Sequence, residues 1–573
     1  MLHLKAFKRE KSLIEKLGEG NAHLAWAMGL YLDSSDLTQL ASESLTDQHN
    51  DKKIDFIRLD RDEKKIIFAQ GYYSPNHNSR SGGAKSNKAA DLNTAAAWLF
   101  SGDLNDVPKN LKSIIQDCRS AIDNGEIEQI DLIYAHNLPE SPSVSKELIT
   151  AALHLQNHLK EKNITVQHRE LGLETLERLY TTQETSLAIL ETINCPEKVL
   201  FEETGPEWKA AVLSVPGSWL RGLFEKHGED LFAANYRGFL GITKRRKINT
   251  SIRQTAESDP KNFWVFNNGV TILTNHIERN YNTTDLTGVS IINGAQTTGS
   301  IGSSSKSSNL EDVKVLCRII ECAHKETIAK IVRFNNSQNV ITTWDSYSNS
   351  EEQKRIQKEF SDLGYDYSLK RGFSDQSAEV GIEQVASALV AFQGDFKSAN
   401  IGKNYIFETK SLYNKAFQNA KARHILLAYA FSKAVDYVRL ELKTKNSLID
   451  IEQKQLNLLR NLRFKNYVLS IIGRSLDSIV GERVDLDHVA FTPECARKSS
   501  NSFNDLIAYC SPIAATIISF LASSISSDFS EVLKDESSLD SNSSNVGVFL
   551  YNLNMAGANP AISSFKDKIS PKG

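Results

Sequence analysis

The sequence has few of the residues that build folds stabilised by disulfide bonds or by structural metal ions. Only six cysteines are spread over 573 residues, none forms a CxxC pair, and no cysteine and histidine cluster has zinc spacing. Thirty glycines and twelve prolines also exclude a collagen-like composition. Scattered cysteines in a long chain are typical of buried thiols in a reducing compartment, so we expect a cytoplasmic protein.

Long apolar segments are scarce as well. Residues 1–13 carry charges where a signal peptide needs an apolar stretch. The most apolar stretch, residues 512–523, includes serines and is shorter than the roughly 20 residues that cross a bilayer. We therefore expect no membrane contact.

An excess of one charge sign is also missing. Lys and Arg together number 67 against 70 Asp and Glu, so the net charge is −3. With 40% apolar and 24% charged residues, the composition is that of a folded globular protein and excludes a wholly disordered chain. Net charge does not fix its local distribution, so a basic patch for nucleic acid is still allowed.

The chain is too long for a single core, because cores stop growing beyond roughly 250–300 residues. We predict a multidomain protein of α/β plus α+β class with three regions. Residues 1–175 form an α/β domain, residues 176–375 a mixed α+β core, and residues 376–573 a mainly helical region. Within the last region, the serine-rich and acidic stretch 524–545 is expected to be a loop or linker.

The first region shows the clearest pattern. Two short apolar runs, 54–60 and 65–73, are separated by a polar turn and predict a β-hairpin. The runs 128–137 and 163–171 predict two strands joined by a helical crossover, which is typical of a parallel pair. An amphipathic helix is expected over residues 12–32, weakened in its middle by glycines.

The hairpin carries a constellation like that of PD-(D/E)xK nucleases. In such enzymes an Asp on one strand, and a Glu or Gln on the next, bind Mg²⁺, while a Lys two residues later stabilises the charge on the phosphate. Asp55 and Gln70 occupy the first two positions. Side chains two apart on a strand share a face, so the residue two after Gln70 points to the same site. That residue is Tyr72, and it stands where the Lys is expected.

Tyr72 cannot supply a positive charge, so the pattern leaves two interpretations. Lys85 or Lys88 on the following segment replaces the missing lysine, and Glu15 or Glu19 on the first helix completes the acidic set. Alternatively, the region is an inactive nuclease-like fold used for DNA docking or assembly. Asp55, Gln70, Lys85 and Lys88 are the catalytic candidates, and Asp55 and Gln70 are the candidate Mg²⁺ ligands.

Three asparagine-rich signatures follow in the middle region. Asn and Gly tolerate positive φ and mark sharp turns, and Asn and Gln amides both donate and accept hydrogen bonds. The signatures either line one polar cleft that binds phosphate at a helix start or satisfy backbone groups at turns without a ligand. Their candidate binding residues are Asn267, Asn268, Asn293, Gly294, Gln296, Thr297, Asn335, Asn336 and Gln338.

A basic run at residues 243–247 is the strongest local concentration of positive charge. Four adjacent cations in such a run can contact a phosphate backbone, although a solvated loop has the same composition. We therefore add Arg237, Lys244, Arg245 and Arg246 to the candidate nucleic-acid contacts.

In this part of the chain the sequence resembles the AIPR (abortive infection phage resistance) family. The resemblance covers at least residues 130–440 and rests on several uncommon strings that occur in order. These strings are residues 166–180, 224–241, 248–252, 263–274, 290–301 and 331–342.

The resemblance implies a bacterial antiphage defence protein. It also implies partners in multi-gene defence cassettes, such as an ATPase, a methyltransferase or another nuclease, and a PD-(D/E)xK-like (restriction-endonuclease-like) N-terminal region. Family members often keep a Lys after the Gln of the second strand, whereas this sequence has Tyr72. A second likeness, of the strand and helix pattern around Asn293-Gly294 to the ParB/sulfiredoxin-like fold, implies nucleotide binding, although Thr297 and Thr298 replace the basic residues of that turn.

The sequence therefore supports a defence protein that engages nucleic acid and, if the hairpin site is competent, cleaves it as a Mg²⁺-dependent nuclease. The alternative is a non-catalytic adaptor that senses a nucleotide or a nucleic-acid end within a multi-protein complex. A nucleotide hydrolase acting at the Asn-Gly-Ala-Gln turn ranks last, because no obvious nucleophile or general base lies in the signatures.

Overall fold

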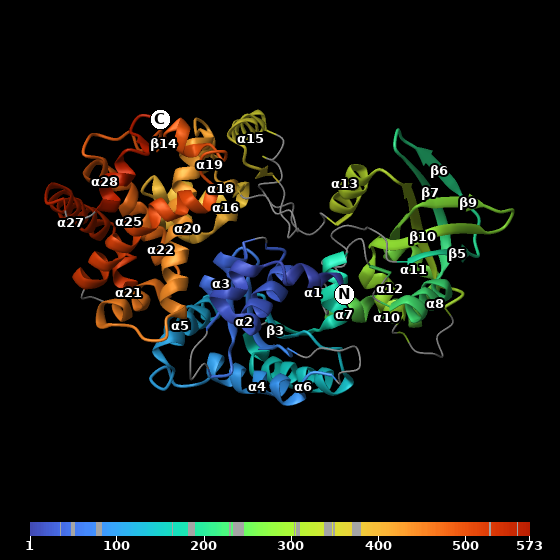
Figure 1. Ribbon diagram of the computed structural model, residues 1–573. Helices are drawn as coiled ribbons and strands as arrows, with labels where there is room; N and C mark the ends of the chain where they lie inside the picture. The colour runs from blue at the N-terminus through green and yellow to red at the C-terminus, as the bar shows by residue number, and fades with distance from the viewer. Residues whose placement is uncertain are drawn as a thin grey trace. The chain divides into compact units, whose positions relative to one another are not determined.

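The structure is a computed structural model. The chain forms two compact units (Figure 1). Unit 1 comprises Met1–Lys5 and Glu174–Ile341, and unit 2 comprises Ala6–Leu173 and Thr342–Gly573. The described residues are all except 35, 47–51, 76–82, 163, 182–188, 229–230, 233–245, 303, 305–309, 337–346, 348–349, 370–379, 526–528 and 558–559. The division into three regions stays a prediction.

Unit 2 begins with an α/β region, Ala6–Leu173, built on a four-stranded sheet of order β1-β2-β3-β4. The first pair is antiparallel and the next two pairs are parallel, which confirms the predicted hairpin and the predicted parallel strands. The elements up to its end are α1 (Leu2–Phe7), α2 (Lys11–Leu32), α3 (Leu37–Ser44), β1 (Phe56–Asp60), β2 (Lys65–Tyr72), α4 (Ser86–Phe100), α5 (Lys109–Asp123), β3 (Gln129–His136), α6 (Pro142–His158), η1 (Lys160–Lys162) and β4 (Thr165–Leu171).

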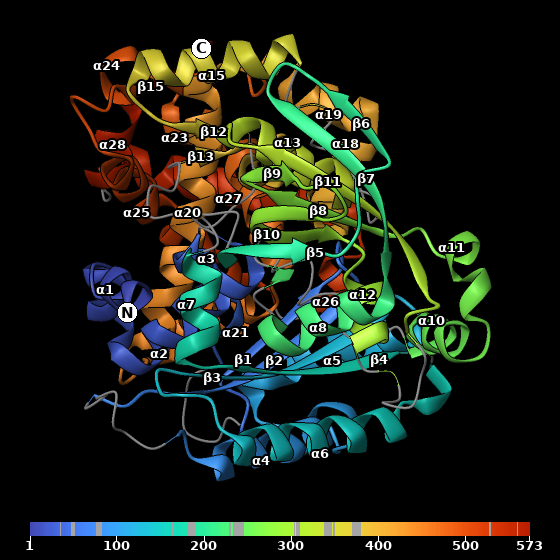
Figure 2. The ribbon, with the colours of Figure 1, turned by 90° about the vertical axis from the view of Figure 1, so that its right-hand side faces the viewer.

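Helices cover both faces of this sheet. On one face, Ile66 and Phe68 of β2 pack with buried residues of α4 and α6, and Figure 2 shows these two helices side by side along the sheet. On the other face, a Cβ added at Gly71 would lie 3.1 Å from Leu24 of α2. Since side chains alternate along a strand, Gln70 belongs to the face that α4 and α6 cover.

The remainder of unit 2, the helical region, confirms the helical C-terminal part predicted from the sequence. The long helices α20, α22 and α25 pack against one another around one apolar core. Its elements are α15 (Glu351–Leu363), β12 (Tyr367–Ser368), β13 (Val380–Gly381), α16 (Ile382–Phe392), α17 (Phe396–Ile401), α18 (Lys403–Glu408), α19 (Lys410–Phe417), α20 (Ala422–Thr444), α21 (Asp450–Arg460), α22 (Phe464–Arg474), α23 (Leu476–Val480), β14 (Ala490–Phe491), α24 (Pro493–Ala496), α25 (Phe503–Ser524), α26 (Phe529–Val532), α27 (Glu536–Met555), α28 (Pro560–Lys566) and β15 (Ile569–Ser570).

Two helices of this region differ from the expectations. The apolar stretch 512–523, which was expected from the sequence to be too short to cross a bilayer, belongs to the 22-residue helix α25. By length and composition alone this helix could cross a membrane. Half of its most apolar window is buried inside the protein. The expectation of a loop or linker over residues 524–545 is wrong for most of its length, because α26 covers Phe529–Val532 and α27 begins at Glu536. Asp535 caps this helix, and Leu539, Val546 and Leu550 are buried at helical spacing.

A buried ion pair joins the α/β region to the helical region. The Lys433 ammonium of α20 contacts the carboxylate of Asp36, the residue that caps α3, and both side chains are almost fully buried. Burial alone would raise the pKa of Asp36, but the charge and the hydrogen bond of Lys433, with a backbone bond from Gln39, lower it below its ordinary value. The pair therefore favours the ionised form of the carboxylate.

A second buried cluster lies beside it. Lys465 of α22 donates to the fully buried Asp436 of α20 at 2.6 Å and lies 3.8 Å from Glu43 of α3. The guanidinium of Arg439 lies 3.3 Å from Asp436 and donates to the hydroxyl of Ser42 at 3.2 Å. Each buried charge in the cluster thus has an opposite charge within reach, as burial requires.

Unit 1 is built on a mixed sheet of order β5-β10-β8-β11-β7-β6, with β9 paired to β10. β8 and β11 run parallel, and the other pairs are antiparallel. The elements are α7 (Leu173–Thr181), β5 (Ile189–Cys195), β6 (Phe201–Thr204), β7 (Trp208–Pro216), α8 (Gly217–His227), α10 (Arg246–Ser258), η3 (Pro260–Asn262), α11 (Phe263–Phe266), β8 (Val270–Thr274), β9 (His276–Arg279), β10 (Thr284–Asn293), α12 (Ala295–Gly302), β11 (Lys314–Cys322) and α13 (Lys325–Asn336).

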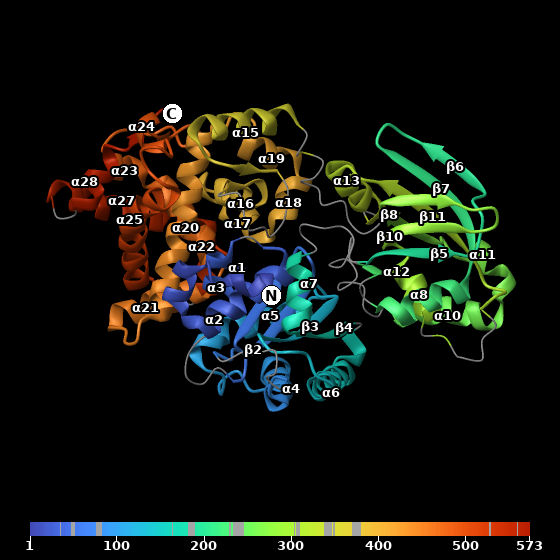
Figure 3. The same ribbon diagram turned by 45° about the vertical axis from the view of Figure 1, so that its right-hand side comes forward.

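The sheet of unit 1 lies between two helical layers. Residues of α8, α11 and α12 join the apolar core on one face, and α13 packs on the other, as Figure 3 shows. The sequence predicts a strand over residues 264–274 that is broken by the Asn-Asn-Gly turn. The part after the turn is confirmed as β8, but the part before it is wrong, because residues 263–266 form the short helix α11. The observed architecture agrees with a mixed α/β multidomain chain, while the nuclease-like and ParB/sulfiredoxin-like fold assignments stay predictions.

The buried cluster yields a prediction for stability. Replacing Lys465 with Met leaves the Asp436 carboxylate buried with less compensating charge, so the free energy of unfolding should fall by about 3–5 kcal/mol. The control is Lys162→Met, because the pair of Lys162 and Asp123 is exposed and should contribute only about 0–1 kcal/mol. Urea denaturation of both variants measures the difference, and equal losses would contradict the assigned role of the cluster.

Candidate functional site

The β1–β2 hairpin places Asp55 beside Gln70. β1 and β2 pair at Phe56 and Ala69, so Asp55, one residue before β1, lies opposite Gln70, one residue further along β2. The Asp55 backbone N–H donates to the Ala69 carbonyl at 3.0 Å, and the Gly71 N–H donates to the Asp55 carboxylate at 2.7 Å. The structure thus brings together the two residues that the sequence predicts as Mg²⁺ ligands.

The side chain of Gln70 is in an unusual state. It is fully buried, yet neither its amide oxygen nor its amide nitrogen has a hydrogen-bond partner among the described residues. Because buried polar groups are nearly always hydrogen-bonded, an orphaned amide at this position indicates a missing partner such as water or an ion.

Lys85 lies close to the position that the nuclease pattern reserves for lysine. Its ammonium nitrogen lies 5.6 Å from the centre of the Tyr72 ring, and its backbone carbonyl accepts a hydrogen bond from Tyr134 at 3.2 Å. Lys88 follows one turn later on α4, and its backbone N–H donates to the Lys85 carbonyl. Of the two candidate lysines, Lys85 is therefore the one with a contact to Tyr72.

Three further residues lie around this site and were not predicted from the sequence: Asp91, Tyr134 and Glu170. Tyr134 lies beside Gln70 in the register of β2 and β3, and its pKa is raised by burial and by the charges of neighbours that include Glu170, Asp55 and Asp91. The phenol therefore keeps its proton and can donate it to the Lys85 carbonyl. The aligned polar positions of parallel strands, here Gln70, Tyr134 and Glu170, were the signal available in the sequence.

The site offers Mg²⁺ only a small number of protein ligands. Mg²⁺ usually keeps several waters and binds one or two carboxylates together with substrate phosphates. Asp55 and Gln70 offer a carboxylate and an orphaned amide oxygen at one place on the sheet. In the described part of the chain, no three His, Cys, Asp or Glu side chains form a metal-binding group, and α2, which carries Glu15 and Glu19, packs on the other face.

The three asparagine-rich signatures also meet, at the end of β10 in unit 1. The Asn267 side-chain oxygen accepts from the Gly269 N–H at 2.8 Å and from the Thr297 hydroxyl at 3.2 Å, which ties the first signature to the second. The Asn293 amide donates to the Asn335 carbonyl at 2.6 Å, which ties the second to the third.

Arg318 on β11 completes this cluster and was not predicted. Its guanidinium donates to the side-chain oxygen of Asn335 and, at 3.4 Å, to the hydroxyl of Thr271. The Asn335 amide nitrogen is bonded to the Ile331 carbonyl at 2.8 Å. These amides are therefore engaged in bonds that hold the turns, which is one of the two interpretations that the sequence left open.

Only two amides of the signatures are without a hydrogen-bond partner in the described part of the chain, Asn268 and Gln296, and neither is buried. The remaining candidates are not placed. Arg237, Lys244, Arg245 and Gln338 lie outside the described residues, and the side chains of Arg246 and Asn336, at the ends of α10 and α13, are not described. Their role in binding stays a prediction.

Comparison with known proteins identifies the family. The family model described as AIPR protein matches residues 232–529, which is 298 of the 573 residues and more than half of the chain. The chain belongs to the AIPR family. This membership indicates a role in abortive-infection defence against phage. No curated protein and no solved structure matches the chain.

The AIPR match covers only part of the candidate chemistry. It includes all three asparagine-rich signatures and the helical region as far as α26. Asp55, Gln70 and Lys85 precede it, so membership of the AIPR family says nothing about the chemistry of the α/β region.

The turn between β10 and α12 yields a second prediction. Gly294 has φ of +93°, and a Cβ at this position would lie 2.7 Å from the Gly269 carbonyl oxygen. Gly294→Ala should therefore lower the free energy of unfolding by about 2 kcal/mol or more.

Gly299 of α12 is the matched control, because an added Cβ there meets no atom within 4 Å. In a helix interior Ala is more favourable than Gly by about 0.5–1 kcal/mol, so Gly299→Ala should be neutral or stabilising. Thermal unfolding compares the two variants; a neutral Gly294→Ala would mean that the signatures do not depend on this turn.

Proposed function

We propose that this AIPR protein acts in antiphage defence by cleaving nucleic acid, with the reacting site at Asp55 and Gln70 of the α/β region. The observation that supports it most is the Gln70 amide, fully buried, aligned with Asp55 and without a partner in the described residues. A structural glutamine would be expected to hydrogen-bond to the protein itself.

In this proposal each residue has a distinct task. Asp55 and Gln70 would hold Mg²⁺, and the bound ion would supply Lewis-acid stabilisation of the charge on the phosphate. Lys85 would place its ammonium against a phosphate oxygen, in place of the lysine that Tyr72 replaces. Tyr134 keeps the Lys85 backbone in position through its hydroxyl.

A non-catalytic adaptor is the second candidate, and Tyr72 is the observation that favours it. An ammonium 5.6 Å from the Tyr72 ring lies beside the expected lysine position, not on the strand itself. In the adaptor the α/β region would bind nucleic acid without cleaving it, and a partner from the same defence cassette would perform the chemistry.

The third prediction separates the two candidates. Asp55→Asn replaces a metal-binding carboxylate with a neutral amide of nearly the same shape, so Mg²⁺-dependent cleavage should fall by at least about 100-fold. The assay offers linear DNA, plasmid and RNA with Mg²⁺ or Mn²⁺ to the purified full-length protein, and EDTA should stop the reaction.

Asp106→Asn is the matched control, because Asp106 is exposed on a loop of the same region. It should leave cleavage unchanged. Equal cleavage by wild type and Asp55→Asn would remove the proposed site. Binding of nucleic acid without cleavage by the wild type would favour the adaptor.

The fourth prediction concerns the replaced lysine. Lys85→Gln should lower the cleavage rate by about 100-fold, because one positive charge at the phosphate is lost. Adding Tyr72→Lys to this variant should restore much of the rate by returning an ammonium to the strand position. Lys146→Gln, an exposed charge on α6, is the control and should have no effect. A double variant as slow as Lys85→Gln would argue that Lys85 does not occupy the lysine role.

A further inference from the structure

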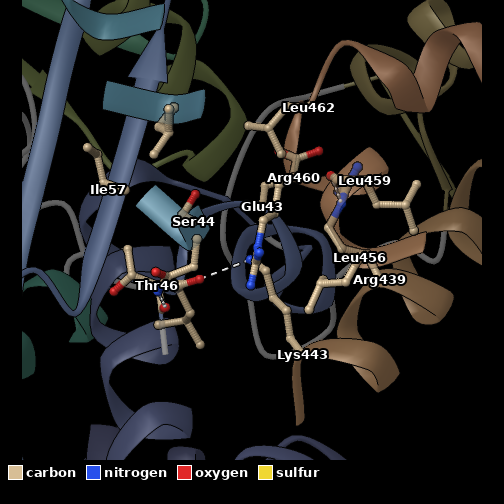
Figure 4. Close-up of a pocket in the computed structure, with 13 residues that line it drawn as sticks. Glu43, Ser44, Thr46, Ile57, Arg439, Lys443, Leu456, Leu459, Arg460 and Leu462 are labelled. Carbon is tan, nitrogen blue, oxygen red and sulfur yellow. Dashed lines mark hydrogen bonds between the residues drawn. The ribbon is translucent and has the colours of Figure 1, made fainter. Parts of the chain in front are cut away.

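A small cavity lies within unit 2, where the α/β region meets the helical region. Its volume is about 40 Å³. Residues of α3, α5 and β1 line one side, and residues of α20 and α21 line the other, and Figure 4 shows these side chains converging on it.

The polar lining is unbalanced in charge. Three cationic side chains face the cavity, Arg439, Lys443 and Arg460, against the single carboxylate of Glu43. Glu43 is already close to Lys465 and Arg58. Arg439 has a second carboxylate neighbour in Asp436, at 3.3 Å, and the Lys443 ammonium donates to the carbonyls of Ser42 and Leu45. Cations therefore still outnumber carboxylates around the cavity. Leucine and isoleucine side chains complete the wall, and this apolar surface weakens the screening of charge by water.

Two polar atoms in the lining have no partner among the described residues. Arg439 is fully buried; one terminal nitrogen and Nε are bonded to protein groups, whereas the other terminal nitrogen, Nη2, is bonded to none. The hydroxyl of Ser44, which is 1% exposed, also has none. Unmet donors of this kind indicate that the cavity holds an acceptor.

Arg460 adds a third donor group. Its guanidinium donates to the side-chain oxygen of Asn457 at 2.6 Å, and among the described residues it pairs with no carboxylate. Burial lowers the pKa of Arg460 below its ordinary value. A negative charge in the cavity would offset this cost of burial.

The volume limits what the cavity can hold. One water needs about 10–15 Å³, so the cavity has room for a few waters or for one small polyatomic ion. It is too small for a whole nucleoside, because pockets for drug-sized ligands start at about 300 Å³. Guanidinium groups favour oxyanions, with which they form charge-assisted hydrogen bonds in a planar fork.

We propose that this cavity binds one phosphoryl oxyanion, as inorganic phosphate or as the terminal phosphate of a nucleotide. Arg439 Nη2, the Arg460 guanidinium and the Ser44 hydroxyl donate to its oxygens, and Lys443 contributes positive charge. The ion bridges α3 of the α/β region to α20 and α21 of the helical region, so its binding stabilises unit 2. This site is separate from Asp55 and Gln70 and does not depend on the proposed nuclease activity.

Calorimetric titration of the full-length protein with sodium phosphate tests the proposal, with sodium chloride at equal ionic strength as the reference. Phosphate should bind and should raise the melting temperature progressively with its concentration, because a ligand of the folded state stabilises it by mass action. Adenosine monophosphate is the second probe. Binding of both probes identifies a nucleotide phosphate as an acceptable source, and binding of phosphate alone identifies the inorganic ion.

Two mild variants locate the site. Ser44→Ala and Arg460→Gln should each weaken phosphate binding at least about tenfold, since each removes one hydrogen-bond donor to the ion. Lys454→Gln removes an exposed charge from the same helix, α21, and should bind like the wild type. Phosphate behaving like chloride in the wild type would overturn the proposal and assign the cavity to water. Unchanged binding in both Ser44→Ala and Arg460→Gln would overturn it as well.

Discussion

The buried charges between α3 and the helices α20 and α22 are the contacts on which the architecture of unit 2 depends. Removing a charge from water is costly, and only an opposite charge in good geometry repays that cost. The partners of Lys433 and Lys465, namely Asp36 and Asp436, meet this condition. Asp36 belongs to the α/β region and Lys433 to the helical region, so neither region can bury its own charge without the other. The two regions therefore form one compact unit although the sheet of unit 1 separates them along the chain.

Local patterns predicted local structure well. The alternating apolar residues of 54–60 and 65–73 gave a hairpin because each strand carries its own register signal, and the structure has it. Two predictions failed because a few residues determine the local structure. Trp264 and Phe266 lie in a short helix before Gly269 and not in a strand. The serines of α27 are tolerated in a helix because Leu539 and Val546 are buried on one side of it. The pair of Asp36 and Lys433 could not be predicted, since its members lie 397 residues apart and neither has a local signature. The sequence could narrow the replacement for the missing lysine only to Lys85 or Lys88. The contact of Lys85 with the Tyr72 ring depends on where α4 begins, which the sequence alone does not determine.

The two candidate sites differ in how well the protein satisfies its own polar groups. At the asparagine-rich signatures, Asn267, Asn293 and Asn335 bond to hydroxyl, backbone and guanidinium groups of the same unit, so the protein itself explains most of these residues. At the hairpin, Gln70 is buried beside Asp55 with both amide atoms unbonded in the described residues. Hydrogen-bond satisfaction therefore ranks the hairpin above the signatures as a place where a ligand completes the structure. The signatures were the stronger signal in the sequence, since unusual strings are easy to see and an orphaned amide is visible only in three dimensions.

The extent of the AIPR match bears on how the α/β region relates to the family. The match begins at residue 232, so it contains Lys433, Arg439 and Lys465 but not Asp36, Ser42 or Glu43, which contact them. A fragment limited to the matched residues would leave the Lys433 ammonium without the Asp36 carboxylate and the Arg439 guanidinium without the Ser42 hydroxyl. Removing the α/β region would also expose the surface of α20 that α3 covers, so the fragment would lose the apolar burial of this contact together with its ion pair. In this chain the α/β region is therefore structurally coupled to helices that lie within the AIPR match, and a chemical step in it would take place on a scaffold that those helices help to build.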